Sequence, residues 1–187
     1  MAGSTFTGTG IAIITPFRKD GSVDFKSLEK LVNFLISGGV NYLVVLGTTG
    51  ETPVLTRDEK KAIVCSVVEV ANKRVPVVMG IGGNNTHEVI DTIKHTTFDG
   101  IDAVLSVSPY YNKPGQEGIY QHYKAIAEAS PLPVILYNVP GRTGSNITAE
   151  TSLRLAKDLK KQIIAIKEAS GNISQIMNIL KDKPAGF

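Results

Sequence analysis

Lys167 stands at the end of a run of apolar, mostly β-branched residues, Ile163–Ile166. A lysine that ends such a strand is predicted to be buried, and desolvation favours the neutral amine, which is a nucleophile toward carbonyl groups. The structural alternative is a lysine held in a salt bridge, for which Glu168 is the adjacent partner. We favour the nucleophilic role, because buried lysines are rare unless they have a function or a partner.

Three further segments place hydroxyl, phenol and guanidinium groups among glycines and prolines: Gly47–Glu51 (GTTGE), Ser108–Pro114 (SPYYNKP) and Tyr137–Gly144 (YNVPGRTG). The glycines allow a backbone to approach a ligand closely, and Arg142 could hold a carboxylate through paired hydrogen bonds. Each segment alone also fits a structural role. These roles are a polar turn, aromatic packing at a surface, and a solvent-facing arginine beside a buried tyrosine.

The three histidines and the single cysteine are not predicted to be metal ligands or nucleophiles. His87, His95 and His122 fall in predicted helices without partners at ligand spacing, so we interpret them as surface or structural residues and predict no metal site. Cys65 lies in the apolar segment 62–68 and is predicted to be a small core residue rather than a nucleophile.

Short apolar runs alternate with amphipathic segments along the whole chain. Strands are predicted over residues 11–15, 42–46, 76–81, 103–107, 134–137 and 162–166, and helices over about 24–37, from 56, from 86, over 117–129, from 148 and over 173–181. Thr56–Glu59 fits a capping box. The near-continuous apolar runs are typical of a parallel sheet, so the chain is predicted to be α/β, either doubly wound or closed into a barrel.

The candidate segments all follow predicted strands, and active sites of parallel α/β folds form beyond those strand ends. A dinucleotide-binding loop is disfavoured, because Gly80, Gly82 and Gly83 have the wrong spacing for it.

Composition narrows the class of protein. The 187 residues are 42% hydrophobic and 20% charged, and the net charge of +3 comes from scattered basic residues, which argues against nucleic-acid binding. No apolar run is long enough to span a membrane, and the N-terminus shows no secretory signal, so a soluble, cytoplasmic protein is expected.

Together, GTTGE, SPYYNKP, YNVPGRTG and IKEASGN (166–172) resemble the dihydrodipicolinate synthase family of pyruvate-dependent, Schiff-base class I aldolases. The resemblance runs from about Gly8 to the last residue. It implies a (β/α)₈ TIM barrel with a C-terminal helical extension, usually a homotetramer of tight dimers, with no metal or organic cofactor. Residues 1–187 would form a single barrel domain of about six βα units, ending before strands 7 and 8 and the extension.

The resemblance implies condensation of pyruvate with L-aspartate 4-semialdehyde to 4-hydroxy-tetrahydrodipicolinate, in lysine and diaminopimelate biosynthesis. Lys167 matches the lysine that forms the imine with pyruvate, and Tyr137 matches the tyrosine that shuttles protons. Thr48 matches the hydroxyl that links Tyr137 to a second tyrosine. Tyr111 matches that second tyrosine, which reaches into the neighbouring subunit's site.

Two further residues match substrate ligands of the family. Thr49 matches a ligand of the pyruvate carboxylate, and Arg142 matches the residue that binds the carboxylate of the semialdehyde. The Thr48–Thr49 pair and Arg142 favour the synthase over sugar-acid lyases of the same superfamily.

The resemblance also implies a regulatory site. Asn84, Glu88 and Tyr110 match residues that bind the feedback inhibitor L-lysine. Arg57 and Lys60 occupy positions where lysine-sensitive enzymes often carry an uncharged group, and these cations should repel the inhibitor's ammonium groups. We therefore expect weak or absent feedback inhibition.

Two alternatives stay open. One is a related pyruvate-dependent sugar-acid lyase or aldolase, which would share the lysine and Tyr137. The other is a catalytically inert truncated barrel that acts as a binding or assembly module, since a barrel without its last strands leaves unpaired edges.

Overall fold

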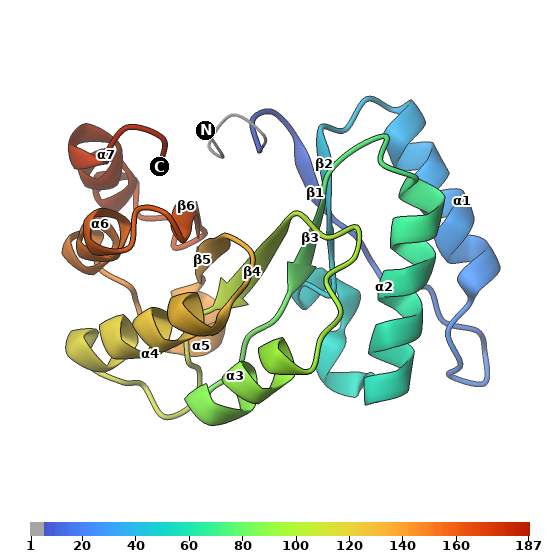
Figure 1. Ribbon diagram of the computed structural model, residues 1–187, viewed down its shortest axis with the longest axis horizontal. Helices are drawn as coiled ribbons and strands as arrows, with labels where there is room; N and C mark the ends of the chain where they lie inside the picture. Colours follow the sequence, from blue (N-terminus) through green and yellow to red (C-terminus); the bar gives the residue numbers. More distant parts are fainter. Residues whose placement is uncertain (1–5) are drawn as a thin grey trace. The chain divides into compact units, whose positions relative to one another are not determined.

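The computed structural model describes residues 6–187, and its elements confirm the predicted α/β class (Figure 1). The strands are β1 (Gly10–Ala12), β2 (Tyr42–Val45), β3 (Val77–Gly80), β4 (Ala103–Val107), β5 (Val134–Asn138) and β6 (Ile163–Glu168). The α-helices are α1 (Phe25–Ser37), α2 (Arg57–Ala71), α3 (Thr86–Lys94), α4 (Gln116–Ala129), α5 (Pro140–Thr143), α6 (Ala149–Asp158) and α7 (Ile173–Asp182). The short 3₁₀ helices η2 (Thr48–Gly50) and η3 (Thr52–Val54), like α5, were not predicted.

The described residues divide into two compact units. The N-terminal unit comprises residues 6–80 and Phe98–Asp102, and the C-terminal unit comprises Ile81–Thr97 and Ala103–Phe187. The N-terminal unit contains β1 to β3, and the C-terminal unit contains β4 to β6. A single domain over the whole chain remains a prediction.

In the N-terminal unit, three parallel strands lie in chain order, with Ile11 opposite Leu43 and Leu43 opposite Val77. Helices α1 and α2 pack side by side (Figure 1). The predicted capping box is confirmed: the Glu59 amide donates to Thr56 Oγ1 over 3.2 Å, and the Thr56 amide donates to Glu59 Oε2 over 2.8 Å. Such a box satisfies free amides of the first turn and sets where α2 begins.

Strand β1 is shorter than the predicted run 11–15. Ile13 still donates its amide to Val44 over 3.0 Å, but the Thr15 hydroxyl donates to the carbonyl oxygen of Gly50 over 2.7 Å. The chain therefore leaves β2 after the Ile13 amide, and Thr15 binds the turn that follows β2.

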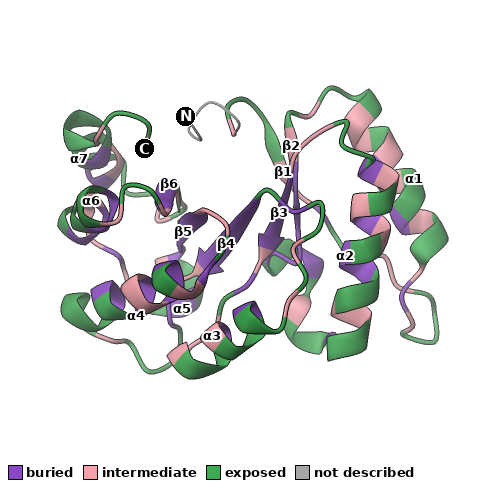
Figure 2. Cartoon of the chain, viewed as in Figure 1, coloured by how far each residue is buried: buried purple, intermediate pink, exposed green. Residues whose placement is uncertain are grey.

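In the C-terminal unit, β4, β5 and β6 are parallel and in chain order. Helix α3 packs against α4, α4 against α6, and α6 against α7. Figure 2 shows that β4 and β5 are buried while each helix exposes one side. No helix within residues 6–187 is long and apolar enough to cross a membrane.

Two of the glycines that are wrongly spaced for a nucleotide loop, Gly80 and Gly82, have packing roles. A Cβ at Gly80 would collide with the backbone carbonyl of Leu46 in the N-terminal unit, and a Cβ at Gly82 would lie 2.8 Å from the amide nitrogen of Val107 in the C-terminal unit. Both glycines therefore permit close approach of two backbones.

The prediction that Cys65 is a core residue is wrong, because Cys65 is exposed. The buried face of α2 consists of Ile63, Val64, Val67 and Ala71. Cys65 lies outside this face, since one residue in a helix turns by about 100° and an apolar run longer than the stripe leaves some of its members in solvent.

His122 is the buried histidine of the C-terminal unit, while His87 and His95 are exposed, as predicted for surface or structural residues. Its Nδ1 lies 2.8 Å from Thr86 Oγ1, and its Nε2 is buried without a hydrogen-bond partner among the described residues. Burial lowers the pKa of His122 from 6.5 to about 4. The His122 ring is therefore neutral in the folded chain at neutral pH.

This burial predicts acid sensitivity. The unfolded chain binds a proton at His122 near pH 6.5, whereas the folded chain binds it only near pH 4. The contribution of the neutral His122 ring to the free energy of unfolding is therefore fully present above pH 6.5. It is lost as the pH falls toward 4, by up to about 1.4 kcal/mol per pH unit. We expect the free energy of unfolding of His122→Asn, measured by urea titration, to change less with pH across this window than that of the wild type. His95→Asn, which changes an exposed ring, should keep the wild-type slope, and equal slopes for both variants would contradict the prediction.

Candidate active site

Lys167 and Tyr137 lie directly opposite each other on β6 and β5. A β-bulge precedes the pair: Val134 opposes Ile163, but Ile135 opposes Ala165. Opposed residues of paired strands project from the same face of the sheet. The structure thus brings the two side chains together, with Lys167 Nζ 4.4 Å from the centroid of the Tyr137 ring.

The expected burial of Lys167 is wrong, because its side chain is exposed, whereas Tyr137 is 6% exposed. Among the described strands β6 pairs only with β5, so it has one open edge. The apolar residues Ile163 and Ile164 are buried earlier in the strand, and burial is lost toward its end. The apolar run therefore shields the start of β6 but not the amine.

The alternative of a salt bridge with Glu168 is not supported either. The Glu168 carboxylate accepts hydrogen bonds from Asn138, Ser170 and Gln175. No residue within 6–187 forms an ion pair with Lys167. Its Nζ instead lies over the electron-rich face of the Tyr137 ring.

The loop that carries Tyr111 is held against the segment that carries Arg142. The Tyr111 amide donates to the Thr143 carbonyl over 3.3 Å, and the Ser145 hydroxyl donates to the Pro109 carbonyl over 2.7 Å. Arg142 lies exposed in the last turn of α5. These contacts place both predicted site residues on one pair of packed loops.

Tyr111 is 87% exposed and has φ +74°. This left-handed conformation is unfavourable for a bulky residue and persists where neighbouring contacts impose it. The bond to Thr143 is one such contact. The backbone at Tyr111 is therefore held, while its ring is exposed to solvent.

Thr48 and Thr49 lie in the N-terminal unit, on η2, and both are exposed. The turn is shaped by Leu46 and Glu51, which have φ of +56° and +54°, and by the Thr52 hydroxyl, which donates to the Leu46 carbonyl over 2.7 Å. The backbone of this turn is thus fixed while two hydroxyl groups face solvent. The other predicted site residues belong to the C-terminal unit.

The residues predicted to bind a lysine inhibitor also fall in both units. Asn84, Glu88 and Tyr110 lie around the start of α3 and after β4 in the C-terminal unit, and Tyr110 is 40% exposed. Arg57 and Lys60 lie in the first turn of α2 in the N-terminal unit, where Arg57 is exposed and Lys60 half-buried.

Behind the Tyr137–Lys167 pair, sequence reasoning missed Asn138, and it considered Glu168 only as a salt-bridge partner of Lys167. Asn138 is fully buried, and Glu168 is directly opposite it in the ladder. The signal was present, since each residue directly follows a predicted site residue, and alternation along a strand places it on the opposite face.

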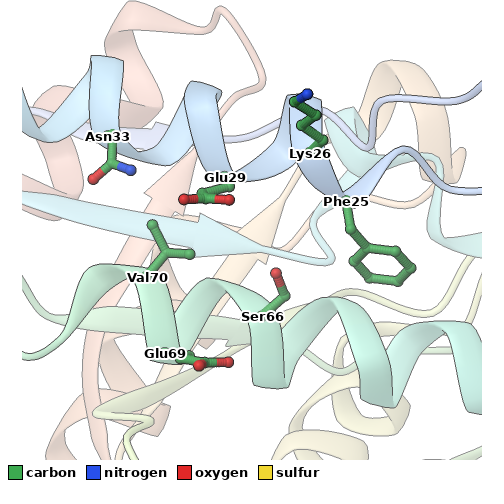
Figure 3. Close-up of a pocket in the computed structure, with 7 residues that line it drawn as sticks. All are labelled: Phe25, Lys26, Glu29, Asn33, Ser66, Glu69 and Val70. Carbon is green, nitrogen blue, oxygen red and sulfur yellow. The ribbon is translucent and has the colours of Figure 1, made fainter.

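A groove in the N-terminal unit contains none of the predicted site residues. It lies between α1 and α2, and its lining residues are Phe25, Lys26, Glu29, Asn33, Ser66, Glu69 and Val70 (Figure 3). Within residues 6–187, no group of three or more His, Cys, Asp or Glu side chains is arranged to hold a metal ion.

Comparison with known proteins relates the chain to one family. Residues 5–187 match the model of the dihydrodipicolinate synthetase family. The chain is 58% identical over 187 residues to a 4-hydroxy-tetrahydrodipicolinate synthase of Parabacteroides distasonis, and covers 63% of that protein. It thus spans less than two thirds of the length of this relative.

Solved structures show the same fold. A dihydrodipicolinate synthase from Aquifex aeolicus is 40% identical, with a TM-score of 0.91 over 97% of this chain and 61% of its own. A chloride-inhibited dihydrodipicolinate synthase from Acinetobacter baumannii, complexed with pyruvate, is 48% identical, with a TM-score of 0.88 over 96% of this chain and 62% of its own. The predicted fold class is therefore confirmed: the chain has six βα units that match part of a TIM barrel.

Proposed function

Because this chain belongs to the dihydrodipicolinate synthetase family, we propose that it carries the imine-forming lysine of a 4-hydroxy-tetrahydrodipicolinate synthase. The substrates would be pyruvate and L-aspartate 4-semialdehyde, and the enzyme would act in lysine and diaminopimelate biosynthesis in the cytoplasm. The observation that carries the proposal is the position of Lys167 Nζ, 4.4 Å from the centre of the Tyr137 ring.

The chemistry begins with attack of the neutral Lys167 amine on the ketone carbon of pyruvate. The resulting carbinolamine loses water to form an imine, and loss of a methyl proton then gives an enamine. The enamine carbon bonds to the aldehyde carbon of the semialdehyde, and the aldehyde oxygen takes up a proton. Transimination by the substrate's own amine closes the ring and releases Lys167.

Proton transfers are needed at both the addition and the dehydration steps, and a phenol beside the amine can relay them. We assign this role to Tyr137, with Thr48 linking it to Tyr111 of a neighbouring subunit. The 87% exposure of Tyr111 is consistent with a contact across a tight dimer within a homotetramer. A complete site would then require at least two subunits.

Two carboxylate groups must also be held. We assign the pyruvate carboxylate to Thr49, since its turn offers a hydroxyl and main-chain donors with a fixed backbone. We assign the semialdehyde carboxylate to Arg142, whose exposed guanidinium can donate two parallel hydrogen bonds.

The decisive test is trapping of the imine. The 187-residue chain is incubated with pyruvate and borohydride, and the peptide that contains Lys167 is weighed by mass spectrometry. The mass of a reduced pyruvyl group on that peptide supports the proposal, and its absence at saturating pyruvate would overturn it for this chain.

The exposed amine and an exposed apolar stripe on α7 favour a second candidate, the inert binding or assembly module. Ile173, Met177 and Leu180 are 66%, 63% and 60% exposed and recur at helical spacing on one side of α7. This candidate predicts no adduct in the trapping test. A related sugar-acid aldolase would instead form the adduct but prefer another aldehyde, which a substrate screen with pyruvate would reveal.

Feedback by L-lysine provides a separate prediction. By resemblance, Asn84, Glu88 and Tyr110 are the predicted inhibitor ligands, and Arg57 and Lys60 occupy positions of the same regulatory site that lysine-sensitive enzymes often leave uncharged. Their cations should repel the ammonium groups of lysine. We expect synthase activity of the assembled enzyme to be nearly unchanged by millimolar L-lysine. Replacement of both cations by histidine should increase the inhibition, whereas strong inhibition of the unmodified enzyme would refute the prediction.

A further inference from the structure

We propose that Glu168, Asn138 and Gln175 position Lys167, because their hydrogen bonds hold the bulged register of β6 that presents the amine beside Tyr137. The inference rests on the proposed function of Lys167. It concerns residues behind the strands, on the side away from the Tyr137 ring.

The bulge determines from which face of the sheet the Lys167 side chain projects. Val134 opposes Ile163 before it, and β6 contributes one extra residue before the pairing resumes. Without this residue, Lys167 would oppose Asn138 instead of Tyr137. Its side chain would then leave the face that Tyr137 occupies, because a shift by one residue turns a strand's side chains to the opposite face.

Hydrogen bonds just beyond the pair clamp this register. Glu168 Oε2 accepts from Asn138 Nδ2 over 2.8 Å and from Gln175 Nε2 over 2.9 Å. Glu168 Oε1 accepts from the Ser170 amide over 2.7 Å. The Ala169 amide donates to the Asn138 carbonyl over 2.8 Å and continues the ladder past the strand. One carboxylate therefore ties β6 to β5, to α7 and to its own following turn.

Both amide side chains that donate to the Glu168 carboxylate, which we call the clamp together with that carboxylate, have further hydrogen bonds. Asn138 is fully buried, and its Oδ1 accepts from the Ile147 amide over 2.9 Å. Gln175 Oε1 accepts from Asn146 Nδ2 over 2.8 Å. The two amide side chains that donate to Glu168 thus have their own oxygens occupied, which fixes their nitrogens toward the carboxylate.

The carboxylate is kept in its ionised form. Partial burial acts to raise the pKa of Glu168, but hydrogen bonds from Ser170, Asn138 and Gln175 outweigh it and hold the pKa below its ordinary value. Hydrogen bonds to an ionised acceptor are stronger than those between neutral groups. Removal of the carboxylate would break the bonds that join β6 to Asn138 and Gln175, although Asn138 Nδ2 would keep its other acceptor, Asn146 Oδ1, at 2.8 Å. A glutamine would retain one acceptor oxygen.

The experiment compares the wild-type chain with Glu168→Ala, Glu168→Gln and Glu150→Ala. Glu150 is an exposed carboxylate of the same unit, in the first turn of α6, and serves as the control. Two quantities are measured for each protein: the rate at which pyruvate is trapped on Lys167 by borohydride, and the hydrogen-exchange rate of the Ala169 amide. Circular dichroism checks that each variant is folded.

We expect Glu168→Ala to slow trapping by about 10- to 100-fold, since small displacements of a reacting group have effects of that size. Exchange at Ala169 should accelerate in the same variant. Glu168→Gln should keep most of the trapping rate and of the protection, and Glu150→Ala should match the wild type. Wild-type trapping by Glu168→Ala, or slow trapping with Ala169 still protected, would overturn the inference.

The exchange measurement separates this inference from the proposed function. If the wild-type chain traps no pyruvate, the proposed function fails for it. The clamp is then judged from Ala169 alone: faster exchange in Glu168→Ala than in Glu168→Gln supports it, and equal exchange overturns it. If Glu168→Ala does not fold, Gln175→Leu, which removes one donor and keeps the carboxylate, replaces it with the same expectations.

Discussion

Replacement of Lys167 by arginine should abolish the reduced pyruvate adduct while the chain remains folded. A guanidinium group does not deprotonate in proteins, so it cannot attack the ketone, although it keeps the charge and can still lie over the Tyr137 ring. Because the Lys167 side chain is exposed, the substitution should change the unfolding free energy by no more than about 0.5 kcal/mol. Intact-mass and peptide mass spectrometry after borohydride treatment measure the adduct directly.

Lys157→Arg is the matched control, since Lys157 is an exposed lysine in the last turn of α6 of the same unit. This variant should form the adduct like the wild type. An adduct that persists in Lys167→Arg and maps to another lysine would show that pyruvate reacts with surface amines in general, and the assignment of Lys167 would be abandoned.

Replacement of Gly80 by valine should strongly destabilise the fold. A Cβ at this position collides with the backbone carbonyl of Leu46. Leu46 has φ +56°, and its carbonyl oxygen also accepts a hydrogen bond from the Thr52 hydroxyl. The backbone there cannot move aside as a flexible side chain would, so we expect a loss of about 3 kcal/mol or more. For a chain of this size the melting temperature should fall by roughly 6–12 °C.

Gly47→Ala is the control in the same unit. A Cβ at Gly47 would lie 3.7 Å from Val44 and 3.9 Å from Ala12, which are ordinary van der Waals distances. Its melting temperature, measured by thermal unfolding, should stay close to that of the wild type. Equal melting temperatures for the two variants would mean that β2 and β3 approach less closely than the structure has them.

The elements that depend on local chemistry were predictable. Residues 103–107 form a strand as predicted, because a mostly apolar and buried run ends at the SPYY loop. The start of α2 was predictable from Thr56 and Glu59, whose two hydrogen bonds involve residues only three apart. Helix α5 was not, since a four-residue helix between Pro140 and Gly144 has no apolar periodicity to reveal it.

The residues of the candidate site were predictable by type and by place along the chain. Lys167, Tyr137 and Arg142 each follow an apolar run, and the carboxyl ends of parallel strands lie at one edge of a sheet. What could not be predicted was the environment of each side chain. The exposure of Lys167 depends on the edge of β6 that no described strand pairs with, and the exposure of Cys65 depends on which face of α2 packs inward.

By itself, the sequence determined the α/β class, the order of six βα units and the polar groups that follow the strands. These properties depend on apolar periodicity, capping and turn residues, which act between near neighbours. Only the tertiary structure decided that Lys167 faces Tyr137, because this depends on one extra residue in β6 and on a carboxylate bound by Asn138 and by a glutamine from α7. Such contacts join residues far apart in the chain, and no local pattern encodes their register.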